Sequence, residues 1–184
     1  MKAPPAWDED SPAITRFLRG DQAAFDTLYR KYYGRVFSVA RGILLDSDEA
    51  ADIVQEVFSL AYKNLIKFDH ASKFSTWLYR IAVNRSIQEA RKRKRSTVSL
   101  DAVQAERLIS PDQETTIGDP EIDSALVQLH PSDRMMLILH YWEELSLAEI
   151  ATLMKCNPNA AKTRLYRARA RLKDILEQAR ADEK

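Results

Sequence analysis

Residues 145–158 allow few local structures, because a helix start, a helix stop and a second helix start follow one another within this short stretch. Ser146 and Glu149 have the spacing of a capping box, in which each side chain accepts a hydrogen bond from the backbone N–H of the other residue. Asn157 is a good N-cap, and Pro158 occupies the first helical position, where its missing N–H costs nothing. Two helices joined by so short a turn cannot be collinear. The sequence therefore predicts a helix-turn-helix.

The second helix of this unit, which we expect to run to about Leu176, is amphipathic and basic. Residues 155–173 contain seven basic residues and no acidic residue. The apolar residues that recur at helical spacing, and that we expect to be buried, are Ala161, Leu165, Ala168, Leu172 and Leu176. Arg, Lys, Asn and Thr contact both phosphates and base edges, so the exposed side favours DNA binding. A basic helix in a plain helical hairpin is the alternative. The candidate DNA-contacting residues are Asn159, Lys162, Thr163, Arg164 and Arg167.

The rest of the chain also predicts an all-α fold, because it has four glycines and long apolar repeats of helical period. We expect helices from Asp21 to Leu44, from Asp46 onward, and over residues 75–95, with Asp21 and Asp46 as N-caps. Residues 96–120 have weak periodicity and several turn-forming residues, with one short helix possible over 100–108. We therefore predict two small helical domains, residues 1–95 and 121–184, joined by a flexible linker, residues 96–120.

Charge is segregated along the chain although the formal net charge is only +1. Residues 46–56 include five acidic residues and no basic residue, whereas residues 91–95 are all basic. Such blocks suggest partners of opposite sign, and ordinary solvated helix faces are the alternative.

Several classes of protein are disfavoured. The one cysteine, Cys156, excludes a disulfide framework and indicates a reducing compartment, and we expect it to pack as a small apolar residue. Three histidines without ligand spacing predict no metal site. We find no nucleotide-binding glycine loop and no pair of nucleophile and base, so we expect no enzyme activity, no cofactor and no small-molecule substrate. Without a signal peptide or an apolar run of about 18 residues, the protein is expected to be cytoplasmic.

Two stretches of the N-terminal half carry a family resemblance. Residues Asp48–Phe58 and Lys73–Asn84 resemble the two signature stretches of the group 4, or extracytoplasmic-function, sigma factors of bacterial RNA polymerase. Residues Leu129–Leu176 are similar to the C-terminal promoter-binding domain of that family. The resemblance covers about residues 20–95 and 121–178. It implies a factor that binds core RNA polymerase and directs promoter-specific initiation at −10 and −35 elements, under the control of an anti-sigma factor.

The resemblance also implies roles for individual residues. The face that binds the clamp helices of the polymerase β′ subunit, with the β subunit as a further contact, would comprise Asp48, Asp52, Gln55 and Glu56. An acidic helix face is complementary to a basic coiled coil. The loop Asp69–Ser72 would capture a flipped base of the −10 element, and single-stranded DNA would follow the next helix. The candidate contacts there are Lys73, Arg80, Asn84, Arg85, Arg91, Lys92, Arg93, Lys94 and Arg95. Trp77 is expected to belong mainly to the core.

The helix-turn-helix would read the −35 element, and here the sequence departs from the family pattern. Many relatives have glycine where this chain has Lys155 and Asn159, and Thr-Val where it has Ala160-Ala161. We therefore expect Lys155 to adopt a left-handed conformation at some energetic cost. The two promoter elements lie about 50 Å apart at roughly 34–36 Å per DNA turn, a distance that an extended linker of about 25 residues spans.

Two other functions use DNA or sigma-like surfaces without initiating transcription. A stand-alone regulator would bind DNA without polymerase and would need a dimerisation surface, which the sequence does not suggest. A sigma mimic that sequesters an anti-sigma factor would be expected to lose its basic DNA-facing residues, and this chain retains them.

Overall fold

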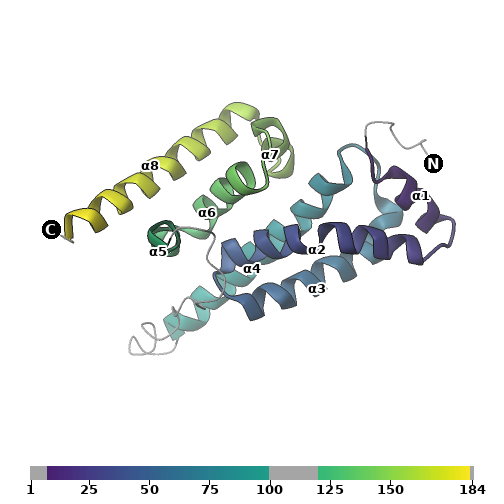
Figure 1. The fold of residues 1–184 in the computed structure, drawn as a ribbon, viewed down its shortest axis with the longest axis horizontal. Helices are drawn as coiled ribbons and strands as arrows, with labels where there is room; N and C mark the ends of the chain where they lie inside the picture. The colour runs from purple at the N-terminus through teal and green to yellow at the C-terminus, as the bar shows by residue number, and fades with distance from the viewer. Residues whose placement is uncertain (1–7, 100–119, 183–184) are drawn as a thin grey trace.

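The computed structural model describes residues 8–99 and 120–182, and within these ranges every regular element is helical (Figure 1). This confirms the predicted all-α class, whereas the predicted linker lies mostly outside the described residues. The elements are α1 (Ser11–Leu18), α2 (Ala23–Leu44), α3 (Ser47–Asn64), the 3₁₀ turn η1 (Leu65–Lys67), α4 (Phe74–Ser99), α5 (Pro120–Gln128), α6 (Pro131–Leu137), the π-helical turn η3 (Ile138–Trp142), α7 (Leu147–Leu153) and α8 (Pro158–Asp182). No described helix is both long and apolar enough to span a membrane.

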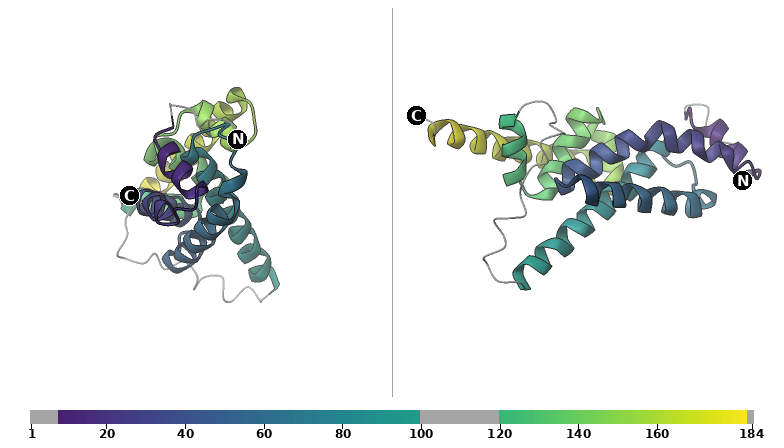
Figure 2. Two further views of the ribbon diagram at one scale, coloured as in Figure 1. Left: turned by 90° about the vertical axis from the view of Figure 1, so that its right-hand side faces the viewer. Right: turned by 60° about the horizontal axis from the view of Figure 1, so that its bottom comes forward.

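The N-terminal half is a bundle of α2, α3 and α4, and α1 packs against α2 near the N-terminus (Figure 1). The apolar stripe of α3 is buried as its spacing predicts, through Ala50, Ile53, Val54, Val57, Phe58 and Ala61. Asp46 caps α3, because its Oδ1 accepts from the backbone N of Glu49 at 2.9 Å. The last turns of α4 project beyond α2 and α3 in all three views (Figures 1 and 2).

The structure corrects two predicted helix boundaries and adds one helix. Helix α2 begins at Ala23, so Gln22 and not Asp21 occupies its N-cap position. The carboxylate of Asp21 pairs with Arg16 at 2.6 Å and also accepts from the backbone amides of Ala23 and Ala24. The short helix α1 was not predicted, because eight residues give too little periodicity to recognise. Helix α4 continues to Ser99, four residues past its predicted end, because the basic run has no helix breaker.

The C-terminal half contains the predicted helix-turn-helix, formed by α7 and α8. The capping box is complete: Ser146 Oγ accepts from the N of Glu149 at 3.2 Å, and Glu149 Oε2 accepts from the N of Ser146 at 3.0 Å. Helix α8 buries Ala161, Leu165 and Ala168 as predicted. Leu172 and Leu176 are only half-buried, because α8 extends beyond the helices that it packs against (Figure 1).

The two halves pack directly against each other. Helix α2 contacts α6 and η3, and α4 contacts α6 and α7, so their buried residues form one continuous apolar cluster. At Gly42 the backbone of α2 lies against the side chain of Ile138, because an added Cβ would lie 2.3 Å from Cδ1 of Ile138. Figure 2 shows the helices of the C-terminal half lying along one side of the bundle. The glycine at position 42 therefore permits this contact.

A buried arginine joins the halves at the same end. Arg134 is 6% exposed, and its Nη2 donates to the carbonyl of Ile43, at the end of α2, at 2.6 Å. Its Nη1 donates to the carbonyls of Leu126, Val127 and Leu129, at and beyond the end of α5. Burial lowers the pKa of Arg134 to about 10, so the guanidinium stays charged at neutral pH. One side chain thereby donates to carbonyls at the ends of two helices, where intrahelical partners run out.

Candidate functional site

The turn between α7 and α8 is held by backbone hydrogen bonds. The N of Cys156 donates to the carbonyl of Ala151 at 2.9 Å, and the N of Lys155 donates to that of Thr152 at 3.3 Å, the pattern of a Schellman motif. This motif places Lys155 in the left-handed region, at φ 51°, which confirms the expectation from the sequence. Cys156 has a free thiol and packs partly buried against the core, as expected.

Helix α8 then presents its basic side to solvent. Asn157 caps it, because its Oδ1 accepts from the N of Ala160 at 2.7 Å. The five predicted −35 residues are all exposed in its first three turns: Asn159, Lys162, Thr163, Arg164 and Arg167. Tyr166 lies among them with 72% of its surface exposed, although it was not among the candidate residues. A large aromatic side chain on a basic helix face was the signal in the sequence that could have included it.

The predicted acidic face lies on α3. Asp48, Asp52 and Gln55 are exposed, and Glu56 is half-buried. Glu56 forms an ion pair with Arg85 of α4, and Glu49 lies 3.6 Å from Arg93. The face thus adjoins the basic side of α4, and Asp48 and Asp52 are its most accessible carboxylates.

The loop before α4 is built on aromatic rings. The ring of Phe68 lies 6.0 Å from that of Phe74 and 5.5 Å from that of Trp77. Phe74 is fully buried and Trp77 packs partly buried against the core, as expected for Trp77. Within the loop, the N of Ala71 donates to Asp69 at 3.0 Å, and His70 has φ 55°. The loop Asp69–Ser72 is therefore an ordered turn that lies over a cluster of aromatic side chains.

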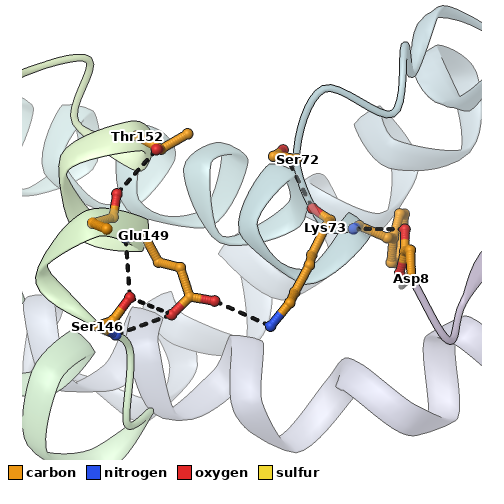
Figure 3. A network of polar contacts seen from close by, with 8 residues as sticks. Asp8, Ser72, Lys73, Ser146, Glu149 and Thr152 are labelled. Carbon is orange, nitrogen blue, oxygen red and sulfur yellow. Dashed lines mark hydrogen bonds and ion pairs between the residues drawn. The ribbon is translucent and has the colours of Figure 1, made fainter. Parts of the chain in front are cut away.

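The start of α4 contacts the first helix of the helix-turn-helix. Lys73 Nζ lies 3.2 Å from Oε1 of Glu149, and Figure 3 shows this side chain reaching from α4 to α7. Arg80 Nη2 donates to the carbonyl of Thr152, in α7, at 2.8 Å. Burial acts to raise the pKa of Glu149, but the hydrogen bonds from Ser146 and Lys73 outweigh it and lower that pKa. Two predicted −10 contacts are thus engaged by the other half of the molecule.

A second polar contact crosses the same junction. Tyr79 is 1% exposed, and its hydroxyl donates to Oε2 of Glu143 at 2.8 Å. Burial raises the pKa of both Glu143 and Tyr79, and Arg35 interacts with Tyr79 from α2. Because the hydroxyl of Tyr79 and the carboxylate of Glu143 hydrogen-bond to each other, neither pays the desolvation penalty of a buried polar group without a partner.

The remaining predicted −10 residues lie farther along α4. Asn84 and Arg91 are exposed and line a groove of about 650 Å³, which also includes Met135, Met154 and Arg164 from α6 to α8. Arg85 is half-buried against Glu56, Lys92 is exposed and bonds to Glu89, and Arg93 is half-buried. Lys94 and Arg95 belong to α4, but their side chains lie outside the described residues.

Comparison with known proteins identifies the family of this chain. Residues 28–96 match Sigma-70 region 2, and residues 120–172 match Sigma-70, region 4. The ECF RNA polymerase sigma-E factor of Escherichia coli K12 is 34% identical, over 87% of this chain and 90% of its own. The chain belongs to the ECF sigma factors. Members of this family are transcription initiation factors that direct core polymerase to promoters.

Two solved structures resemble the whole ECF sigma factor fold. CnrH in complex with the cytosolic domain of CnrY has a TM-score of 0.71 and 25% identity, and the match covers 93% of this chain and 99% of that one. Sigma factor RpoE in complex with the anti-sigma factor NepR from Bartonella quintana has a TM-score of 0.68 and 27% identity, covering 83% and 96%. In both comparisons, the similarity extends over the two halves of the fold.

Among the described residues, no group of three or more His, Cys, Asp or Glu side chains is arranged to hold a metal ion.

Proposed function

We propose that this ECF sigma factor uses three surfaces, one for core polymerase, one for the −10 element and one for the −35 element. Residues 1–95 would bind core polymerase and the −10 element, residues 121–184 would bind the −35 element, and residues 96–120 would link them. The observation that carries the proposal is the exposed basic face of α8, presented by a fully capped helix-turn-helix, in a chain that also contains Sigma-70 region 2.

The acidic face of α3 is proposed to dock on the clamp helices of the β′ subunit. Its contact residues would be Asp48, Asp52, Gln55 and Glu56. Exposed carboxylates attract a basic partner over a Debye length of about 8 Å at physiological salt. Docking through this face therefore becomes weaker as the salt concentration rises.

The start of α4 and the loop Asp69–Ser72 are proposed to hold the opened −10 element. Unstacked bases bind aromatic surface with cations alongside. Of the rings beneath the loop, Trp77 is half-buried and partly accessible, whereas Phe68 and Phe74 are buried and support the loop from below. The contact residues would be the neutral amide of Asn84 and eight cations: Lys73, Arg80, Arg85, Arg91, Lys92, Arg93, Lys94 and Arg95. The −35 contacts would be Asn159, Lys162, Thr163, Arg164 and Arg167.

We infer that the packed arrangement of the two halves is the state that does not bind promoters. Lys73 and Arg80, two proposed −10 contacts, bond to α7, so single-stranded DNA and α7 compete for the start of α4. An anti-sigma factor would act by stabilising this arrangement, as the similarity to RpoE bound to NepR supports. Since polymerase and chromosomal DNA are the proposed partners, the protein would act in the cytoplasm.

A reconstitution experiment tests the proposed function. Purified protein, added to bacterial core polymerase and a library of randomised promoters, should yield transcripts that share one upstream and one downstream element. Replacing either element should abolish initiation. Tight sequence-specific binding of the protein alone, without initiation when core is present, would instead identify a stand-alone regulator.

A further inference from the structure

Among the described residues next to the start of α4, none caps the helix with its side chain. Its first residue is Phe74, so Lys73 occupies the N-cap position, and the carbonyl of Lys73 accepts from the N of Trp77 at 3.1 Å. A lysine side chain has no acceptor with which to cap a helix. Ser72 donates its hydroxyl to the carbonyl of Lys73, and Asp69 accepts from Ala71 inside the loop. The first-turn amides of α4 therefore need an acceptor from elsewhere.

Asp8 supplies that acceptor from the N-terminal arm, residues 8–10. Its Oδ2 accepts from the N of Phe74 at 3.2 Å, across 66 positions of sequence, and its Oδ1 accepts from the N of Asp10 at 3.3 Å. The residue is 4% exposed, and burial raises its pKa although the two amides act to lower it. Figure 3 shows Asp8 beside the start of α4. One carboxylate thus caps α4 and folds the arm.

The arm is fastened to α2 by its other buried carboxylate. Asp10 is 3% exposed and accepts from the hydroxyl of Tyr32 at 2.5 Å and from Nζ of Lys31 at 2.6 Å. The ring of Tyr32 in turn lies 5.6 Å from that of Phe74. The arm, α2 and the first turn of α4 therefore form one connected unit.

This unit holds the loop that precedes α4. The ring of His70 packs on Phe68 at 4.6 Å, and Phe68 packs on Phe74, the residue whose amide Asp8 caps. His70 has a left-handed backbone, and its Nδ1 is buried without a hydrogen-bond partner among the described residues. The loop conformation therefore depends on the aromatic cluster beneath it, and hence on the first turn of α4.

From these contacts we infer that Asp8 is a positioning residue of the −10 site. By capping α4 from the N-terminal arm, it holds the loop Asp69–Ser72 in the conformation that captures a base. The arm lies outside residues 28–96, which match Sigma-70 region 2. The inference rests on the proposed function, since it requires that this loop binds the −10 element.

The test compares holoenzymes that contain the full chain with Asp8→Ala, Asp8→Asn or Glu9→Ala. Asn caps helices about as well as Asp, so Asp8→Asn should restore function. Glu9 is the matched control in the same arm, because its side chain is 80% exposed and its ion pair within the described part of the chain is with Lys31. Each holoenzyme is titrated with single-stranded non-template −10 oligonucleotides, taken from promoters that the wild-type selects, with an abasic site at each position in turn.

We expect the wild-type to lose affinity when the captured base is missing. In Asp8→Ala, the ratio of affinities for the intact and the abasic oligonucleotide at that position should be about fivefold smaller than in the wild-type, because losing one helix cap costs about 1 kcal/mol. Asp8→Asn and Glu9→Ala should keep the wild-type ratio. A uniform loss of affinity for all oligonucleotides, with unchanged abasic effects, would make Asp8 merely structural and overturn the inference.

One outcome of this titration and one further measurement keep the test decisive. If no abasic site weakens wild-type binding, the proposed −10 function fails, and that result is distinguishable from a failure of Asp8 alone. If Asp8→Ala does not fold, Asp8→Ser, whose hydroxyl is too short to reach α4, replaces it. Amide exchange should then be faster at residues 74–77 than in the wild-type, and unchanged protection there would contradict the cap.

Discussion

At the scale of single residues, left-handed backbone conformations, which cost an L-residue free energy, occur in turns, and two of these turns adjoin the proposed DNA-binding surfaces. Within residues 8–99 and 120–182, four non-glycine residues have a left-handed backbone: Leu45, His70, Glu144 and Lys155. His70 lies in the proposed capture loop, and Lys155 occupies the position after α7 that glycine usually fills. These turns are retained because the hydrogen bonds on either side of them fix the direction of the chain.

The strain at Lys155 leads to a stability prediction. A left-handed conformation costs an L-residue about 1–2 kcal/mol, and glycine loses about 0.5–1 kcal/mol more through backbone entropy. Lys155→Gly should therefore stabilise the protein by up to about 1 kcal/mol, or roughly 2–4 °C in Tm, in a thermal melt. Lys155→Ala, which keeps a Cβ, should give no such gain. A glycine variant less stable than the alanine variant would contradict the expected strain.

At the scale of elements, one helix serves two surfaces. Helix α3 buries its apolar stripe in its own bundle and exposes Asp48, Asp52 and Gln55 on the opposite side. Glu56 and Glu49 instead pair with arginines of α4. The accessible charge of the proposed docking face is therefore smaller than the sequence alone indicates.

Charge reversal at Asp52 tests the docking face. Because Asp52 is exposed and lies beyond the first turn of α3, Asp52→Lys should leave folding unchanged but place a like charge against the basic clamp helices. We expect core affinity to fall by about tenfold, or roughly 1.4 kcal/mol, in a titration against core polymerase. Asp174→Lys, at an exposed position on α8, is the control. Equal affinities for the two variants would exclude Asp52 from the interface.

At the scale of the whole molecule, the two halves are held together from both ends of their contact. Arg134 and Gly42 act at the end of α2, and Lys73, Tyr79 and Arg80 act along α4. The contacts along α4 involve residues proposed to bind DNA. Promoter binding and packing of the halves are therefore mutually exclusive in this proposal.

Gly42 provides a way to separate the halves. A leucine there would occupy the space of Ile138, whereas Gly34, in the same helix, has no atom within 4 Å of an added Cβ. Gly42→Leu should therefore increase the radius of gyration measured by small-angle scattering and strengthen binding of single-stranded −10 DNA without core. Gly34→Leu should do neither. A Gly42→Leu protein as compact as the wild-type would show that this contact does not hold the halves together.

The sequence by itself determined the local structure. The helix-turn-helix, its capping box, the N-cap of Asn157 and the left-handed Lys155 follow from interactions among residues a few positions apart. The apolar stripe of α3 and the exposed face of α8 follow from helical periodicity, because neighbours on one helix face are neighbours in sequence.

Only the tertiary structure decided how these parts meet. The cap that Asp8 places on α4, the contact of Arg134 with Ile43 and the pairing of Glu56 with Arg85 all join residues far apart in the chain. Capping patterns and periodicity report contacts within a few residues, so they carry no signal for such pairs. The proposed −10 residues were therefore predictable as a basic helix face, whereas their engagement by α7 required the packed fold.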